Sequence, residues 1–258
     1  MDSLVSIITP LHNSEQFISV TIESVLKQTH ERLEMIIVDD ASTDNSCLIV
    51  EKYIEQDDRI KLIKLEVNSG PAASRNRAIR EARGRYIAFL DSDDLWAPDK
   101  LARQIAFMQK CQTPLSFTGY YHISEEDSEI TSYIGVPERV DYEELLKQNT
   151  IGCLTAMYDT NVLGKVYMPE IQKRQDFALW LKILKKTPYA YGLDEPLAYY
   201  RVRTASVSSN RLLASTYNWK MYREVEKLPL HKAIYYFGWY TFRIVIKYVN
   251  INYLQRIK

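Results

Sequence analysis

The chain has 258 residues, of which 46% are hydrophobic and 26% are charged, as is typical of a folded protein with one large domain or a domain and an appendage. Because 33 basic side chains balance 33 acidic ones, the net charge gives no general attraction to nucleic acid, and we expect no nucleic-acid partner. The three cysteines lack metal-ligand spacing and the first residues lack a signal-peptide pattern, which predicts reduced thiols and a cytoplasmic protein.

Strand-like and helix-like segments alternate through the first part of the chain. Short apolar runs predict strands at 5–9, 33–38, 60–65 and 86–90. Helical spacing and helix-start residues predict helices at 15–28, 47–54 and 71–82. This alternation is typical of βαβ units and predicts an α/β fold with a mostly parallel central sheet flanked by helices.

Polar clusters follow three of the predicted strands, namely Thr9-Pro10, Asp39-Asp40 and Asp91-Ser92-Asp93-Asp94. Open parallel sheets bind ligands beyond the carboxyl ends of their strands, so we expect the three clusters to share one pocket. Asp39-Asp40 suits recognition of a base and a ribose, although a turn closed by side-chain hydrogen bonds explains the same residues. No GxGxxG motif follows the first strand, which weakens a dinucleotide-dehydrogenase interpretation.

The run Asp91-Ser92-Asp93-Asp94 places three carboxylates within four residues. Like charges this close repel one another unless a cation or a hydrogen-bonding network lies among them. Mg²⁺ and Mn²⁺ prefer oxygen ligands, and Mg²⁺ is usually held by one or two carboxylates together with substrate phosphates. The run therefore suits a nucleotide-diphosphate site with a divalent cation. The alternative is a solvated acidic turn in which Asp91 caps the next helix.

Five segments of the chain, in order and at suitable separations, resemble the glycosyltransferases of family 2, which have the GT-A fold. The segments are VSIITP at 5–10, IVDDASTD at 37–44, GPAASRNR at 70–77, GRYIAFL at 84–90 and DSDD at 91–94. The resemblance covers about residues 4–205 and implies a Rossmann-like, mostly parallel sheet flanked by helices. It implies a GT-A catalytic domain at 1–205, with a nucleotide half at about 1–110 and an acceptor half at 111–205.

The resemblance also implies roles for the polar clusters. Asp40 and Thr9 would contact uracil or another base, with Pro10 and Asp39 beside them. In the acidic run, Asp93 and Asp91 would reach a Mg²⁺ or Mn²⁺ ion on the donor diphosphate. Asp91 and Asp94 would also hold the ribose, the sugar or a metal-bound water.

A catalytic base is expected at Asp176, in the segment RQDFALWL at 174–181. This segment resembles the acidic helix start that precedes a Leu-Trp pair in the family. Many relatives carry Glu before this Asp, whereas Gln175 stands here, and that departure weakens the role of the neighbour more than that of the base. A helix-start charge without catalytic function is the alternative.

Three arginines in two segments of the chain are candidates for binding the donor phosphates, because the planar arginine fork can donate two parallel hydrogen bonds to them. Arg75 lies in the helix that Pro71 opens, and Arg201 and Arg203 follow an apolar-aromatic run. A His often takes the place of Arg203 in relatives, so its partner is open. Surface salt bridges are the alternative for these three, and they are the preferred interpretation for Arg77, Arg80, Arg83 and Arg85.

The last part of the chain is basic and aromatic. Residues 211–258 contain nine Lys and Arg against two Glu, and Ala233 to Phe242 is an uncharged run rich in aromatic side chains. The run is too short to span a bilayer, which needs about 20 apolar residues. We expect 206–258 to form a helical extension, whose segment 231–250 either lies on an anionic membrane face or packs on protein, including a second copy in a homodimer.

The sequence thus predicts a metal-dependent, inverting glycosyltransferase that moves a sugar from a nucleotide-diphosphate donor, favoured to be a UDP-sugar. The expected acceptor is a hydroxyl of a glycan or lipid-linked glycan in cell-surface polysaccharide synthesis, at or near the inner face of the cytoplasmic membrane. A sugar-phosphate nucleotidyltransferase would share the metal and the sheet. It usually has a Gly-rich loop after the first strand, which TPLHN at 9–13 is not. A noncatalytic nucleotide-sugar-binding protein is the other alternative.

Overall fold

The first part of the chain forms the βαβ units that the sequence predicts. The computed structural model describes residues 3–126, 129–203 and 211–255, and the side chains of all of these except 211–214 and 244–255. The strands are β1 Val5–Leu11, β2 Leu33–Asp39, β3 Ile60–Lys64 and β4 Tyr86–Phe89. The helices between them are α1 Ile18–Leu26, α2 Ser46–Ile54 and α3 Pro71–Glu81. The pairings β1/β2, β2/β3 and β1/β4 are all parallel, as expected.

The second part of the chain adds shorter and more varied elements. Its strands are β5 Leu95–Trp96, β6 Leu115–Ile123, β7 Ile130–Ile134, β8 Arg139–Val140, β9 Met157–Asp159 and β10 Ala190–Arg201. Its helices are α4 Lys100–Cys111, α5 Tyr142–Lys147, the 3₁₀ turn Cys153–Thr155, α6 Thr160–Leu163 and α7 Gln175–Leu184. A capping box of Asp141 and Glu144 fixes the start of α5.

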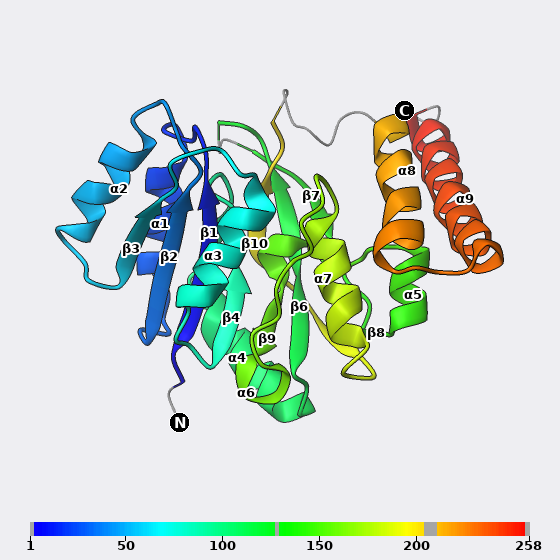
Figure 1. The fold of residues 1–258 in the computed structure, drawn as a ribbon, viewed down its shortest axis with the longest axis horizontal. Helices are drawn as coiled ribbons and strands as arrows, with labels where there is room; N and C mark the ends of the chain where they lie inside the picture. Colours follow the sequence, from blue (N-terminus) through cyan, green and yellow to red (C-terminus); the bar gives the residue numbers. More distant parts are fainter. Residues whose placement is uncertain (1–2, 127–128, 204–210, 256–258) are drawn as a thin grey trace.

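All ten described strands join one sheet with helices on both faces (Figure 1). The strand order is β3-β2-β1-β4-β9-β6-β10-β5, with β7 paired to β6 and β8 paired to β10. The sheet is mixed in its second part: β6 and β10 are parallel, whereas β9 runs antiparallel to both β4 and β6. The predicted central sheet flanked by helices is confirmed, and β9 joins its parallel first part to the second.

The central strands bury both of their faces. Ile7 and Met35 pack with α1, α2 and α4 on one face, whereas Ile8 and Ile36 pack with α3, α5 and α7 on the other. All four side chains are fully buried. A parallel strand covered on both sides needs apolar side chains at successive positions, which explains why these strands read as continuous apolar runs rather than alternating ones.

Two helices near the end of the chain pack beside α5 and α7 (Figure 1). They are α8 Arg211–Lys220, continued by the π-helical turn Met221–Val225, and α9 Leu230–Gln255. Tyr222 donates to the carbonyl oxygen of Leu146 at 2.6 Å, and Tyr236 donates to Glu143 at 2.6 Å. The predicted helical extension therefore packs on the rest of the chain along one side. The predicted boundary at 205/206 and the side chains of 244–250 lie outside the described part.

A buried lysine lies between α4 and the sheet. Lys100 has no exposed surface, its Nζ donates to Gln104 Oε1 at 2.7 Å, and the nitrogen lies 4.1 Å from the centroid of the Trp96 ring. Burial lowers the pKa of Lys100 to about 7. Gln104 in turn donates to Ser116 Oγ and to the carbonyl oxygen of Thr155, both at 3.0 Å. This network ties α4 to the 3₁₀ turn.

Replacing Lys100 with methionine should stabilise the fold more at pH 7 than at pH 9. The unfolded chain protonates Lys100 below about pH 10.4, whereas the folded chain does so only below about pH 7. Between these values the unfolded state binds more protons, so the free energy of unfolding of the wild type rises with pH, by at most ~1.4 kcal/mol per unit. Chemical unfolding at both pH values measures the difference, with the exposed Lys110→Met as control. An equal gain at both would contradict the lowered pKa.

Candidate active site

A pocket of about 950 Å³ lies where β1, β2 and β4 end, as the sequence predicts. Both parts of the chain line it. The first part contributes Pro10, Leu11, His12, Ser14, Asp40, Asn68, Gly70, Pro71, Ser74, Arg75, Asp91, Ser92, Asp93 and Asp94. The second contributes Tyr120, Gly152, Cys153, Leu154, Gln172, Lys173, Arg174, Gln175, Asp176, Tyr200, Arg201, Arg203 and Tyr217. Nine of the eleven predicted site residues therefore meet in one cavity, and Asp39 and Thr9 do not line it.

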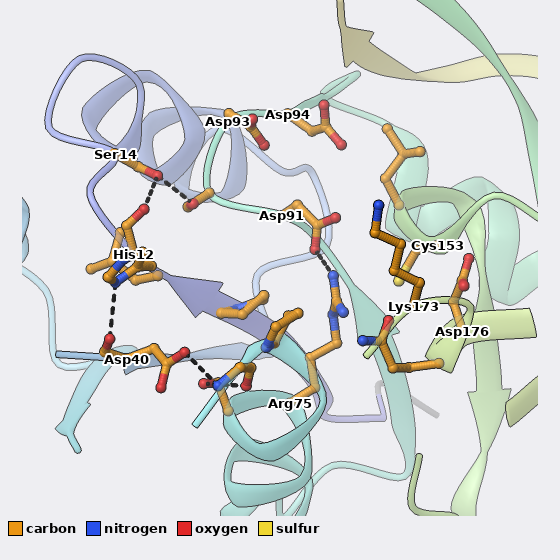
Figure 2. Close-up of a pocket in the computed structure, with 18 of the residues that line it drawn as sticks. His12, Ser14, Asp40, Arg75, Asp91, Asp93, Asp94, Cys153, Lys173 and Asp176 are labelled. Atoms are coloured by element: carbon orange, nitrogen blue, oxygen red, sulfur yellow. Dashed lines mark hydrogen bonds and ion pairs between the residues drawn. The ribbon is translucent and has the colours of Figure 1, made fainter. Parts of the chain in front are cut away.

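Asp40 organises one end of the pocket by binding backbone donors. Its two carboxylate oxygens accept from the backbone N–H groups of Ser69, at 2.7 Å, and Gly70, at 2.8 Å. These bonds fix the loop that leads into α3, where Gly70 has φ +85°, a value that suits glycine. The carbonyl oxygen of Asp40 accepts from His12 Nδ1 at 2.9 Å, so Asp40 joins the ends of β1 and β2 to α3 (Figure 2).

Thr9 and Asp39 lie beneath this end of the pocket. Thr9 has no exposed surface, and its hydroxyl has no hydrogen-bond partner in the described part of the chain. Asp39 is 3% exposed and accepts from the backbone N–H of Ser42 at 3.2 Å. Both side chains support the pocket floor rather than open into it. Pro10, the third residue predicted here, does line the pocket.

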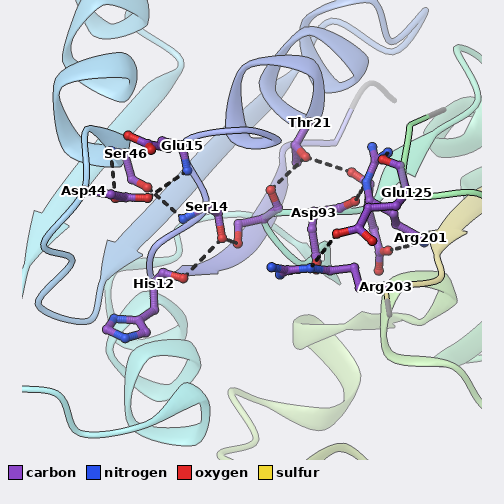
Figure 3. A network of polar contacts seen from close by, with 12 residues as sticks. His12, Ser14, Glu15, Thr21, Asp44, Ser46, Asp93, Glu125, Arg201 and Arg203 are labelled. Carbon is purple, nitrogen blue, oxygen red and sulfur yellow. Dashed lines mark hydrogen bonds and ion pairs between the residues drawn. The ribbon is translucent and has the colours of Figure 1, made fainter. Parts of the chain in front are cut away.

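A network of hydrogen bonds positions the acidic loop, defined as residues 91–94, against α1. Ser14 Oγ lies 2.9 Å from Ser92 Oγ, and Thr21 Oγ1 donates to the carbonyl oxygens of Ser92 and Asp94 at 3.1 and 3.0 Å. Figure 3 shows how this network runs from His12 to the loop. The loop is thus held at its backbone, which leaves its carboxylates to face the pocket.

Each carboxylate of the acidic loop has a basic neighbour. Asp91 pairs with Arg75 at 2.5 Å and Asp93 pairs with Arg203 at 3.3 Å. Asp94 accepts from the backbone N–H of Arg201 at 2.9 Å. The Arg201 guanidinium donates to the carbonyl oxygens of Asp93, at 2.7 Å, and Glu125, at 2.9 Å, and its side chain is almost fully buried. We therefore expect Arg201 to position the loop, while Arg75 and Arg203 remain candidates for phosphate.

Burial and the crowding of carboxylates raise two pKa values in the loop. Burial, followed by the charge of Asp91, raises the pKa of Asp93, against the opposing effect of Arg203. Burial and the charges of Asp93 and Asp91 raise the pKa of Asp94 well above its usual range. Such shifts mark a place where an added positive charge would be stabilised.

Asp176 lies across the pocket from the acidic loop, in the first turn of α7 (Figure 2). Desolvation by burial raises its pKa, while a backbone hydrogen bond and the charges of Arg75 and Arg174 oppose the shift. Arg174 has φ +67°, an unusual value for a residue with a side chain, directly before the helix. Trp180 on α7 packs edge-on against Phe89, with ring centroids 5.4 Å apart. A rigid helix therefore presents Asp176 to the pocket.

Several residues that line the pocket are not predicted from the sequence. His12 lines the pocket beside Asn68, and Cys153, Lys173 and Tyr217 line its other end. The sequence gives no motif for them, because they come from loops and from a helix beyond the resemblance. The predicted surface salt bridge is confirmed for Arg77, which pairs with Glu81, whereas Arg83 and Arg85 pair with the buried carboxylates of Glu34 and Asp159.

Comparison with known proteins identifies the family. The chain matches the model of glycosyl transferase family 2 over residues 6–166. It is 46% identical over 244 residues to the putative teichuronic acid biosynthesis glycosyltransferase TuaG of Bacillus subtilis, covering 95% of this chain and 97% of TuaG. It is 38% identical over 235 residues to the Escherichia coli UDP-Glc:alpha-D-GlcNAc-diphosphoundecaprenol beta-1,3-glucosyltransferase WfgD, covering 91% of each.

A solved structure of similar shape supports the fold. Residues 1–349 of Staphylococcus aureus TarS, in complex with UDP-GlcNAc, superimpose with a TM-score of 0.71 at 23% identity, covering 92% of this chain and 71% of that one. At this identity the likeness concerns the fold alone, and it confirms the predicted GT-A architecture. The family-model match and the two close relatives confirm the predicted enzyme class. The chain therefore belongs to glycosyl transferase family 2 and is a glycosyltransferase with a GT-A fold.

Proposed function

We propose that the protein transfers a sugar from a UDP-linked donor to a hydroxyl of a lipid-linked glycan, with inversion at the sugar carbon. One observation carries this proposal: a single pocket holds the crowded carboxylates of the acidic loop on one side and Asp176 on the other. The loop suits a nucleotide diphosphate and a cation, and the separate acid suits a base for the incoming alcohol. Recognition of the base and ribose falls to the Asp40 end of the pocket.

The reaction needs only one protein base. The acceptor oxygen bonds to C1 of the donor sugar as the bond from C1 to the diphosphate breaks, and the electron pair leaves with UDP. Asp176 takes the proton of the attacking hydroxyl, a role typically worth ~10²–10⁴-fold in rate. Its raised pKa makes it a stronger base than an exposed aspartate. A single displacement of this kind inverts the configuration at C1.

A divalent cation, Mg²⁺ or Mn²⁺, fits the acidic loop through Asp93 and Asp91. The described part of the chain holds no group of three or more His, Cys, Asp or Glu side chains arranged for a metal. Two carboxylates nevertheless suit such an ion when the donor phosphates complete its ligands. A positive charge would also oppose the burial and the charge of Asp91, which together raise the pKa of Asp93. The bound ion would supply Lewis-acid stabilisation of the charge on the departing diphosphate.

The acceptor is inferred from the two close relatives, because their names describe teichuronic acid biosynthesis and transfer to a sugar diphosphate on undecaprenol. We infer that this chain likewise serves synthesis of a cell-envelope polysaccharide. Its acceptor is then a sugar linked through diphosphate to a lipid. Among the described residues no helix is long and apolar enough to cross a bilayer.

Contact with a membrane face is proposed for α9. Leu230, Ile234, Tyr235 and Phe242 on this helix are each more than half exposed, and the exposed Lys232 lies among them. Apolar and aromatic side chains together with basic ones suit the interface of an anionic membrane. Flotation with phosphatidylglycerol vesicles should recover the protein, and the double variant Ile234→Glu/Phe242→Glu should lose this binding. Retained binding, or loss of a dimer instead, would contradict the proposal.

The function is tested with the full-length protein, Mn²⁺, a panel of UDP-sugars and a synthetic GlcNAc diphosphate bearing a lipid tail. We expect one UDP released for each sugar added to the acceptor. Formation of UTP and a sugar phosphate from a UDP-sugar and added inorganic diphosphate would instead indicate a nucleotidyltransferase. Donor binding without turnover would indicate a noncatalytic binding protein.

A further inference from the structure

One wall of the pocket comes from α8, outside the part of the chain that the family model matches. Tyr217 on this helix lines the pocket and is half-buried. Its hydroxyl donates to Gln172 Oε1 at 2.9 Å, and the ammonium group of Lys173 lies 5.3 Å from the centroid of its ring. An aromatic face and a cation thus lie together beside α7, the helix that carries Asp176.

This wall is firmly attached to the catalytic part of the chain. In the π-helical turn after α8, Met221 and Tyr222 are each 1% exposed. Glu226 follows the turn and forms an ion pair of 2.6 Å with Lys185, the residue after α7. The turn that follows α8 is thus tied to the end of α7, which places Tyr217 on the same side of the pocket as Asp176.

Lys173 points into the pocket from the same side. Figure 2 shows its side chain extending between Cys153 and the acidic loop. Two arginines of the pocket lie at the acidic loop, where Arg75 pairs with Asp91 and Arg203 pairs with Asp93. Positive charge for the donor phosphates is therefore present at the acidic loop, and Lys173 adds a cation on the side of the base.

We propose that Tyr217 and Lys173 form an acceptor subsite, in which the tyrosine ring stacks on the sugar that carries the attacking hydroxyl and the lysine binds the diphosphate attached to that sugar. This inference rests on the proposed function and extends it to residues that the family motifs do not include. Pockets for small ligands combine aromatic faces with a few placed polar groups in this way. Lysine is a common phosphate partner because it presents a compact positive charge.

Binding of two synthetic probes tests the subsite directly. One is N-acetylglucosaminyl diphosphate with a short alkyl tail, and the other is the neutral alkyl N-acetylglucosaminide with the same tail. Calorimetry with the full-length protein saturated with UDP and Mn²⁺ measures both dissociation constants. The variants are Tyr217→Ala, Tyr217→Phe and Lys173→Gln, with the exposed Lys220→Gln on α8 as the matched control for charge.

Substitutions of Tyr217 and of Lys173 should change the affinities for the two probes in different ways. Tyr217→Ala should weaken both probes about 10-fold, which corresponds to ~1.4 kcal/mol, whereas Tyr217→Phe keeps the ring and should bind like the wild type. Lys173→Gln should remove the preference for the diphosphate probe and leave the neutral probe unaffected, and Lys220→Gln should change neither. Equal binding of both probes by the wild type, or a Tyr217→Ala variant with unchanged affinities, would overturn the subsite.

The same experiment separates this inference from the proposed function. If UDP with Mn²⁺ does not bind when it is titrated into the protein before the probes are added, the proposed function fails. If UDP binds and UDP-sugar is turned over while the diphosphate probe does not bind, only the acceptor subsite fails. A Lys173→Gln variant that loses affinity for UDP rather than for the acceptor probe would assign Lys173 to the donor and overturn its proposed role.

Discussion

Replacing Asp176 with asparagine should lower the rate of sugar transfer by about 10²–10⁴-fold, the usual contribution of a general base. Asparagine keeps the size of the side chain but cannot accept the proton of the attacking hydroxyl. The residue lies across the pocket from the acidic loop and from Asp40, so the affinity for UDP with Mn²⁺ should stay within a few-fold of the wild type. Steady-state transfer rates and UDP calorimetry measure the two effects.

The pH dependence of the wild-type reaction is a second test of Asp176 as the catalytic base. Burial raises the pKa of Asp176 above its ordinary range, which is near 3.9 for an aspartate. The base acts as the anion, so kcat/KM should fall as the pH drops through this raised pKa and stay level above it. The low-pH fall should be absent from the residual activity of the Asp176→Asn variant. Near-normal turnover by that variant, or an unchanged acid limb, would remove Asp176 from the mechanism.

Replacing Asp93 with asparagine should lower transfer by about 10²–10³-fold, the scale seen when one group that stabilises transition-state charge is lost. The neutral amide removes a carboxylate that faces the pocket beside Asp91, and with it one proposed ligand of the cation. Binding of Mn²⁺ to the UDP complex, followed by electron paramagnetic resonance, should weaken in parallel. The exposed Asp58→Asn serves as the control for the loss of one negative charge.

The outcome for Asp93 also distinguishes two explanations of its ion pair with Arg203. If Asp93 only positions Arg203, Asp93→Asn should leave Mn²⁺ binding intact and raise the KM for the donor. If it holds the cation, Mn²⁺ affinity should fall together with kcat. Intact Mn²⁺ affinity would therefore contradict the assignment.

The first part of the fold is well predicted because its strands are short apolar runs that alternate with clear helix signals. Gly70 and Pro71 mark the start of α3, and the predicted strand at 33–38 matches β2 within one residue. The second part could not be predicted at this level. β9 has three residues, β5 and β8 have two each, and such short strands are defined by their neighbours in the sheet rather than by their own sequence.

The residues of the site likewise divide into those that the sequence predicts and those that it does not. Asp40 and the acidic loop could be found because they follow predicted strands, and Asp176 because its segment resembles the acidic helix start of the family. The burial of Thr9 could not be predicted, because it depends on how β1 is covered. Tyr217 and Lys173 could not be found either, since tertiary packing of α8 against the segment before α7 brings them to the pocket.

The most direct test of the account is a crystal structure of the full chain with Mn²⁺ and a non-hydrolysable UDP-sugar. We predict that the metal bonds to Asp93 and to both donor phosphates, with the base near Asp40 and C1 of the sugar facing Asp176. A nucleotide bound away from the acidic loop, or a sugar carbon turned away from Asp176, would contradict the claim that one pocket joins the donor diphosphate to the catalytic base.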